Sequence, residues 1–229
     1  DICPSRGLGD VYKRQVPINN SVIGEKANST RPEIEQVMFV NNIERESNFD
    51  YSKELYLVRR RLEKRIAKQQ INGFYVCSLS FESIIYKGLF LAEQLSIFYP
   101  DLANKNFVSS YAVFHQRYST NTFPSWGLAQ PFRMLAHNGE INTISGNTNW
   151  MRNHQTRITS EIFGDDSEQV KPIIEKNVSD SAALDAAFEL YVRAGRSVPL
   201  VKTLLIPEAW SKRSELMPIE HRNMYEFSN

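Results

Sequence analysis

The sequence predicts one domain that mixes helices with short strands, of the α/β or the α+β class. Three observations support this prediction. Apolar residues recur at helical spacing between residues 51 and 66, and several short runs elsewhere are rich in β-branched and aromatic residues. No internal repeat or low-complexity linker divides the chain, and its 229 residues are enough to bury a core.

The clearest helical signal lies before residue 68. Apolar residues recur there at steps of four, three, four and four, which places them on one face of a helix: Tyr51, Leu55, Val58, Leu62 and Ile66. The opposite face carries basic residues: Arg59, Arg60, Arg61, Lys64, Arg65 and Lys68. We expect this basic face to be solvated, because Glu54 and Glu63 interrupt it, and contact with nucleic-acid phosphates is the alternative.

The remaining elements follow from the same patterns. Strands are expected at residues 33–40 (EIEQVMFV), twice within 74–88, at 111–116 and at 132–136. Helices are expected at residues 89–98, 147–155, 181–194 and 197–206. Pro100 should end the first of these helices and Gly195 the third.

Composition favours an ordinary protein of a reducing compartment. A formal net charge of +1 gives no overall attraction to nucleic acid or anionic membrane. No apolar run approaches the roughly 20 residues that a membrane helix needs. Cys3 and Cys77 are too few for a disulfide framework, and we expect Cys77 to be a packed core thiol. The expected location is cytoplasmic, or plastidic if the source is a plant or an alga.

The first candidate site is the segment HQRYSTNTFPSW, which begins at His115, where a strand is expected to end. The forked donors of Arg117 match a carboxylate, and pairing with an internal acid is the alternative. His115 could be a base or a metal ligand, but no second ligand stands at metal-binding spacing, so a structural histidine is favoured.

The second candidate site is the segment LAHNGEIN, residues 135–142. A turn at Asn138–Gly139 can direct the asparagine amide and the glycine N–H at one point, as in an oxyanion hole. Asn-Gly is also a strong signal for a tight β-hairpin, and taken alone the pattern favours that alternative.

The third candidate site is Asp180, in the segment SDSAALDAAFEL. The residue stands where a helix N-cap is expected, and its carboxylate could equally hold a substrate ammonium group. The segment SGNTNWMRN, residues 145–153, offers amides and Trp150 as support for a neighbouring site.

Taken together, these segments resemble a known family. HQRYSTNTFPSWGLAQPFRMLAHNGEINTISGNTNWMRN is similar to the class II glutamine amidotransferase domain of glutamate synthases, as are IEQVMFV, SLSFESIIYKG, DSAALDAAFEL and AGRSVPLVKTLLIPEAW. The resemblance implies an N-terminal nucleophile hydrolase fold, an α+β sandwich with αββα layers, here truncated at both ends. We expect residues 1–15 to be a non-native leader and residues 16–229 to be a partial amidotransferase domain.

The resemblance also implies roles for individual residues. Arg117 would bind the α-carboxylate of glutamine and Asp180 its α-ammonium, with Thr120 a further substrate contact. Asn138 and Gly139 would form the oxyanion hole. The nucleophile of the family is an N-terminal cysteine, and neither Cys3 nor Cys77 resembles it, so the resemblance predicts an inactive fragment.

For the full-length enzyme, the resemblance implies an oxidoreductase that passes ammonia from L-glutamine to 2-oxoglutarate and so forms glutamate. FMN and an iron–sulfur cluster would lie in a synthase domain of the same chain, with no cofactor or metal in this segment. An NADPH-oxidising small subunit or ferredoxin would be the partner, and neither nucleic acid nor membrane is expected. The alternatives are a catalytically dead glutamine-binding module and a class II amidotransferase for another acceptor.

Overall fold

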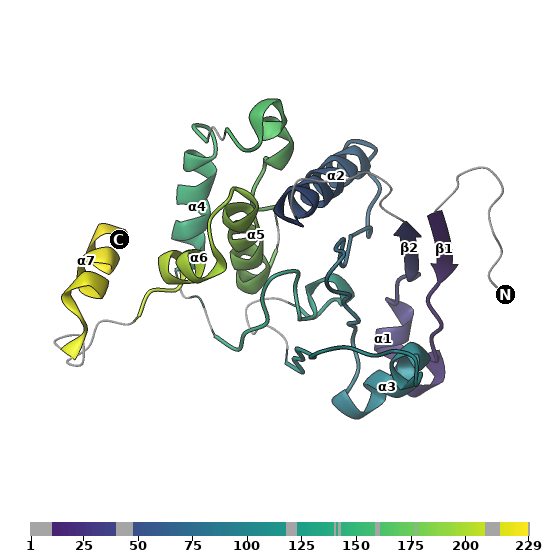
Figure 1. Ribbon diagram of the computed structural model, residues 1–229. Coiled ribbons are helices and arrows are strands. Elements are labelled where there is room, and N and C mark those ends of the chain that lie inside the picture. Colours follow the sequence, from purple (N-terminus) through teal and green to yellow (C-terminus); the bar gives the residue numbers. More distant parts are fainter. Residues whose placement is uncertain are drawn as a thin grey trace.

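The computed structural model (Figure 1) describes residues 11–39, 48–117, 123–139, 141, 143–158, 161–176, 178–208 and 216–228. The strands are β1 (Val11–Gln15) and β2 (Glu35–Phe39). The α-helices are α1 (Glu25–Ser29), α2 (Asn48–Lys68), α3 (Leu95–Phe98), α4 (Ile144–His154), α5 (Asp180–Arg193), α6 (Val198–Leu205) and α7 (Ile219–Ser228). Short 3-10 helices are η1 (Asn20–Val22), η2 (Ala92–Gln94), η3 (Pro100–Ala103), η4 (Trp126–Leu128) and η5 (Gly164–Val170).

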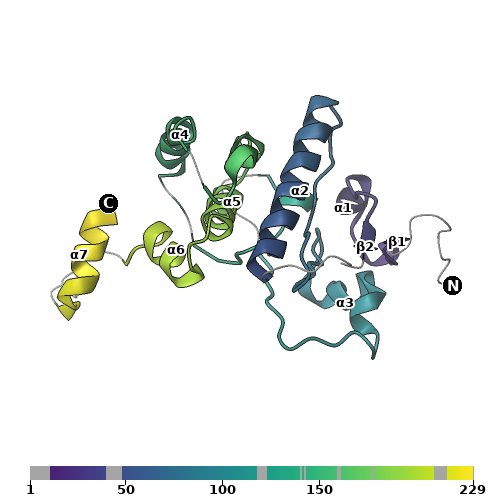
Figure 2. The same ribbon diagram turned by 45° about the horizontal axis from the view of Figure 1, so that its top comes forward.

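The elements gather into two groups. Helices α2, α4, α5 and α6 lie together in a helical group, whereas β1, β2, α1 and α3 form an N-terminal group beside α2 (Figures 1 and 2). Helix α7 lies beyond α6, at the C-terminal end of the molecule. The mixed class predicted from the sequence is confirmed. No helix among the described residues is long and apolar enough to cross a membrane.

The two strands pair antiparallel, from Val11 opposite Phe39 to Gln15 opposite Glu35. The strand predicted after Glu33 is therefore confirmed as β2. Strand β1 lies within the segment expected to be a leader, and Arg14 joins it to η3 through an ion pair with Asp101. The boundary at residue 16 stays a prediction.

The other predicted strands were wrong for the residues that the structure describes. Segments 74–88, 111–117 and 132–136 contain no strand, and β1–β2 is the one sheet in the described ranges. A run with strand-like composition forms a strand only when a neighbouring segment accepts its backbone hydrogen bonds. Tyr111 and Phe114 instead lie exposed, and the αββα layers remain an expectation.

Three of the four other predicted helices are confirmed, as α4, α5 and α6. The predicted helix at residues 89–98 is divided into η2 and α3. Helix α5 ends as expected at Gly195, whose φ of 89° is a left-handed conformation that suits glycine. The N–H of Gly195 donates to the Val192 carbonyl (3.0 Å) and that of Arg196 to the Tyr191 carbonyl (3.1 Å), which is a Schellman motif.

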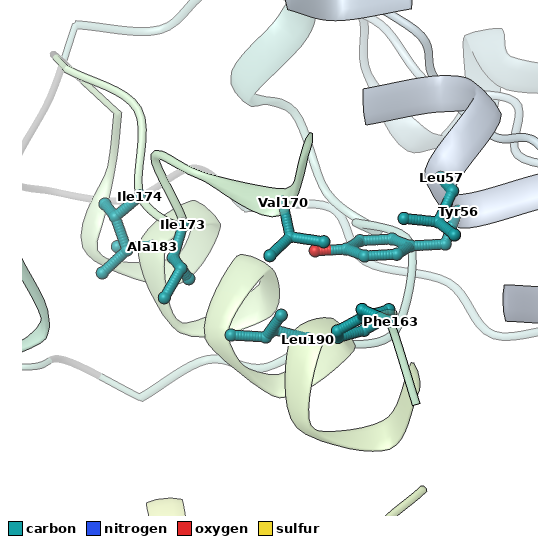
Figure 3. Packing of buried hydrophobic residues seen from close by; sticks show 8 residues of the cluster. All are labelled: Tyr56, Leu57, Phe163, Val170, Ile173, Ile174, Ala183 and Leu190. Atoms are coloured by element: carbon teal, nitrogen blue, oxygen red, sulfur yellow. The ribbon is translucent and has the colours of Figure 1, made fainter. Parts of the chain in front are cut away.

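The apolar core of the helical group joins α2 to α5 and to the segment between α4 and α5. Its buried residues are Tyr56, Leu57, Phe163, Val170, Ile173, Ile174, Ala183 and Leu190 (Figure 3). Tyr56 reaches from α2 toward Val170 and Phe163, and its ring centroid lies 6.0 Å from that of Phe163. Burial of these side chains, at about 1.5–3 kcal/mol for each large one, fixes α5 against α2.

The core of the N-terminal group is largely aromatic. Its buried residues are Val16, Ile23, Phe98, Tyr99 and Trp126. The ring of Phe98 packs edge-on against Tyr99 at 4.7 Å and lies 5.7 Å from Trp126. Packing is close enough at Gly88 that a Cβ atom there would collide with the rings of Phe90 and Trp126. This cluster anchors η4, which begins nine residues after Arg117.

Helix α2 forms as predicted, but its buried face differs from the predicted one. Leu55 is buried, whereas Val58 is 50% and Leu62 38% exposed. Arg59 and Arg60 are only 4% and 5% exposed, so the prediction that they belong to a solvated face was wrong. Tertiary contacts explain this burial, because carboxylates and carbonyl groups from later segments pair with the two guanidinium groups.

Candidate functional site

The candidate site is built around the N-terminus of α5. Ser179 is the N-cap, and its hydroxyl accepts a hydrogen bond from the Ala182 N–H at 3.1 Å. Asp180 is therefore the first helical residue, and the expectation that it caps the helix was wrong. Its side chain lies near the positive end of the helix.

Asp180 connects α5 to the HNG loop, which we define as the described residues 137–139 and 141. The residue is 4% exposed, and its Oδ1 accepts a hydrogen bond from the Ser181 N–H at 2.7 Å. Its Oδ2 accepts one from the Ile141 N–H at 3.3 Å. The structure thus brings together two of the candidate sites, which are about forty residues apart in the sequence.

The HNG loop is not a tight β-hairpin. Neither Asn138 nor Gly139 has a positive φ, which a type I′ turn requires at both of its central residues, and no strand flanks them in the described part. Both residues are exposed. The Gly139 N–H donates to Nδ1 of His137 at 3.2 Å, so the donor expected in an oxyanion hole already has an acceptor.

The segment before the loop is held by two side chains that the sequence analysis did not select. The Gln130 amide holds the backbone of His137 at both polar groups: its Oε1 accepts from the His137 N–H, and its Nε2 donates to the His137 carbonyl, each at 2.9 Å. Asp185 of α5 accepts hydrogen bonds from Met134 N–H (2.8 Å) and Leu135 N–H (2.9 Å). It also accepts one from Arg133 N–H at 3.3 Å.

Asp185 is one of the most deeply buried polar residues in the described ranges, with 1% of its surface exposed. Burial raises the pKa of its carboxyl group, and the hydrogen bonds from Met134 and Leu135 oppose that rise. No local sequence signal indicates that Asp185 accepts these backbone hydrogen bonds, because the three donors lie about fifty residues before it.

A buried ionic cluster joins α2 to α5. Arg59 donates to Glu189 of α5 (2.5 Å) and, through its other terminal nitrogen, to both oxygens of Glu63 (2.7 and 2.9 Å). Arg60 and Arg133 also contact Glu63, at 2.8 and 3.2 Å. Burial alone would raise the pKa of Glu63, but the charges of Arg59, Arg133 and Arg60 outweigh it and lower that pKa. These contacts weaken the nucleic-acid alternative, because they use cations that phosphates would need.

Arg117 lies exposed at the end of an extended segment. Its backbone N–H donates to Nδ1 of His115 at 3.1 Å, in the same way that Gly139 donates to His137. Within the described ranges its guanidinium forms no ion pair, contrary to the alternative of an arginine paired with an internal acid, and no hydrogen bond joins it to Asp180 or the HNG loop. Thr120 lies outside the described residues.

The remaining candidates do not belong to this site. Cys77 is half-buried and donates to the Ile85 carbonyl at 3.6 Å, and burial raises the pKa of its thiol, as expected of a core cysteine. Trp150 is 76% exposed, and α4 contains no buried residue, so the expected support from this segment is not seen. In the described part of the chain, no group of three His, Cys, Asp or Glu side chains is arranged to hold a metal ion.

Comparison with known proteins gives one matching family and several relatives. The family model "Glutamine amidotransferases class-II" matches residues 2–229. The chain is 56% identical over 216 residues to the glutamate synthase [NADPH] large chain of Azospirillum brasilense, with 94% of this chain and 14% of that protein covered. It is 43% identical to the ferredoxin-dependent glutamate synthase of Spinacia oleracea, and this match covers 95% of the chain and 13% of that protein. It is 42% identical to the glutamate synthase [NADPH] large chain of Bacillus subtilis, and this match covers 93% of the chain and 14% of that protein. The chain thus spans about a seventh of the length of these relatives.

Proposed function

The chain belongs to the class II glutamine amidotransferases, and we propose that it supplies the glutamine-binding and oxyanion-stabilising residues of a glutamate synthase. The contact between Asp180 Oδ2 and the Ile141 N–H carries this proposal, because it sets a buried carboxylate beside the HNG loop. A carboxylate next to two amide donors is what a glutamine substrate with an α-ammonium group and a polarised side-chain amide requires.

In the proposed complex, the two charged groups on the α-carbon of glutamine are recognised by side chains of opposite charge. The guanidinium of Arg117 binds the α-carboxylate through paired N–H donors, and Asp180 accepts hydrogen bonds from the α-ammonium. Thr120 is a further proposed substrate contact in the same loop as Arg117. The exposed guanidinium of Arg117, without an ion pair in the described ranges, is available for this role.

The HNG loop supplies the electrophilic part of the site. As a nucleophile attacks the side-chain amide of glutamine, negative charge develops on the amide oxygen, and the Asn138 amide and the Gly139 N–H donate to it. Such a donor contributes roughly 3–4 kcal/mol to transition-state stabilisation. Because the Gly139 N–H is bonded to His137 Nδ1, the substrate oxygen must replace that ring nitrogen as acceptor.

The nucleophile of the proposed reaction is a cysteine thiolate, which forms a glutamyl thioester and releases ammonia; water then releases glutamate. Cys77 does not suit this role, because its half-buried thiol has a raised pKa. Because the resemblance assigns the nucleophile to neither Cys3 nor Cys77, we propose that this chain by itself binds glutamine without hydrolysing it at a measurable rate.

In the full-length enzyme, the released ammonia would convert 2-oxoglutarate to glutamate in a synthase domain. FMN and an iron–sulfur cluster would serve that domain. The two cysteines of this chain cannot provide the four thiolates that such a cluster uses. The relatives' names include both NADPH and ferredoxin as donors, so either an NADPH-oxidising subunit or ferredoxin is the proposed partner.

The test of binding is calorimetric titration of this chain with L-glutamine. Replacement of either charged residue, Arg117→Ala or Asp180→Asn, should weaken binding about tenfold to a hundredfold, because a charge-assisted hydrogen bond is worth about 1.5–3 kcal/mol. Arg61→Ala is the matched control, since Arg61 is a half-exposed arginine of α2 that pairs with Asp166 of η5. Equal binding by all four proteins would refute the proposal.

The test of the reaction uses the full-length protein that contains this chain. Glutamine-dependent release of ammonia, together with formation of glutamate from 2-oxoglutarate, is the expected result. Glutamine binding without ammonia release would indicate a catalytically dead glutamine-binding module. Ammonia release without use of 2-oxoglutarate would indicate an amidotransferase for another acceptor.

A further inference from the structure

We propose that Asp185 is a positioning residue that sets the oxyanion donors of the HNG loop in place from within helix α5. The inference rests on the proposed function, because it assigns a role to a residue that does not itself touch glutamine. It adds Asp185 to the site residues that the family resemblance implied.

The first argument is the number and direction of the hydrogen bonds that Asp185 accepts. Its two carboxylate oxygens bind three consecutive backbone N–H groups, those of Arg133, Met134 and Leu135. These residues form a turn that ends two residues before His137. A carboxylate suits three converging donors because it is purely an acceptor, whereas an asparagine side chain presents one acceptor oxygen and one donor group.

The second argument is that α5 holds the loop on both sides of Asn138. Asp185 binds the backbone at Met134 and Leu135, and Asp180 binds it at Ile141. Five residues along an α-helix correspond to about 7.5 Å of axial rise. The helix therefore provides two fixed points, and the stretch that contains Asn138 and Gly139 spans between them.

The third argument is that the Gln130 side chain joins the segment before the turn to His137, the first residue of the HNG loop. The Gln130 amide pairs with both backbone polar groups of His137, at 2.9 Å each, and thereby ties the start of the loop to the start of the turn. A displacement of the turn would be passed to His137 and from there to the Gly139 N–H, which donates to the His137 ring.

The fourth argument concerns charge. Asp185 is 1% exposed and forms no ion pair among the described residues, and burial raises the pKa of its carboxyl group. Burial of a carboxylate is unfavourable unless donors surround it, and the three backbone N–H groups offset part of that cost at Asp185. The site thus holds a buried charge whose partners are the backbone groups of the turn.

The experiment compares Asp185→Asn with Glu189→Gln in the full-length protein that contains this chain. Both changes neutralise a buried carboxylate on α5, but Glu189 binds Arg59 and has no bond to the turn or the HNG loop. Steady-state hydrolysis of L-glutamine gives kcat and KM, and amide hydrogen exchange reports on Met134, Leu135 and Gly139.

Asp185→Asn should lower kcat at least tenfold and change KM less than threefold, because oxyanion stabilisation acts in the transition state and Arg117 and Asp180 still bind the substrate. Exchange at Met134, Leu135 and Gly139 should become faster. Glu189→Gln should keep kcat within about twofold and leave exchange at these three amides unchanged, even though it lowers stability.

Equal losses of kcat in the two variants would overturn the inference, since a general loss of stability would then explain both. An active parent enzyme with an unchanged Asp185→Asn variant would also overturn it, but would leave the proposed function intact. A parent enzyme that binds glutamine but releases no ammonia would overturn the proposed function and this inference together.

Discussion

The buried pair of Arg59 and Glu189 gives the most informative test of the packing between α2 and α5. Arg59 is 4% exposed and donates to Glu189 Oε2 at 2.5 Å, and its Nη1 contacts Glu63. We consider three proteins: Arg59→Met, Glu189→Met and the double variant. Methionine roughly fills the space of either side chain and adds no polar group.

The magnitudes follow from which charge each change leaves unpaired. Arg59→Met leaves Glu189 buried without its side-chain partner, and we expect a loss of about 3–5 kcal/mol in the free energy of unfolding. Glu189→Met leaves Arg59 its bonds to Glu63, so the loss should lie near the lower end, about 3 kcal/mol. The double variant removes both charges and should recover most of the loss, to within about 2 kcal/mol of the parent chain.

Urea unfolding of the four proteins at pH 7, followed by circular dichroism, measures these differences as a double-mutant cycle. The expected result is a favourable coupling energy of several kcal/mol that changes little between low and moderate salt, because both side chains are shielded from solvent. If the double variant is as unstable as the sum of the single variants, the two charges do not interact, and the reasoning is refuted.

Two further predictions concern stability. Burial would raise the pKa of Glu63, but the charges of Arg59, Arg133 and Arg60 lower it below the ordinary value of 4.5. The ionised carboxylate therefore contributes its full stabilisation above pH 4.5, and this stabilisation is lost as the pH falls through the lowered pKa. Glu63→Gln should therefore flatten the decline of the urea midpoint below pH 4.5, and an unchanged decline would contradict this. Phe98→Ala should cost about 3–5 kcal/mol, because Phe98 has no exposed surface, whereas Phe123→Ala, at a 94% exposed residue, should cost almost nothing. Similar losses from both, measured by urea unfolding, would contradict the packing described for the N-terminal group.

The fold was predictable where local signals decide it. Helix α5 begins beside Ser179 and ends at Gly195, and both residue types favour these positions in any sequence. The strand at residues 35–39 was predicted from its composition, and it forms because β1 pairs with it. The strands expected at residues 111–116 and 132–136 were not confirmed, because a strand depends on a partner. In the second case, the N–H groups of Met134 and Leu135 donate to a side chain.

The buried face of α2 shows a different limit. Apolar spacing predicted Val58 and Leu62 inside and the basic residues outside, yet Arg59 and Arg60 are buried and Val58 is half exposed. A guanidinium can be buried when carboxylates and carbonyl groups meet it, and here they come from Glu63, Glu189 and Pro172. Two of these three partners lie more than 110 residues away along the chain, so no pattern within the helix could have indicated them.

In the candidate site, too, some residues could be selected from local sequence signals and others could not. Residues that would touch glutamine stand in short, distinctive motifs, and Arg117, Asn138, Gly139 and Asp180 could therefore be selected from the sequence, although their roles stay predictions. The residues that hold the HNG loop carry no such signal. From the sequence, Asp185 is an ordinary polar residue of an amphipathic helix. In the structure, three backbone N–H groups from about fifty residues earlier in the chain donate to it. Residues that contact the substrate can thus be recognised from local motifs, whereas the positions of these residues are set by contacts between distant segments. The Asp185→Asn variant tests this directly, because it removes such a contact and leaves the motifs unchanged.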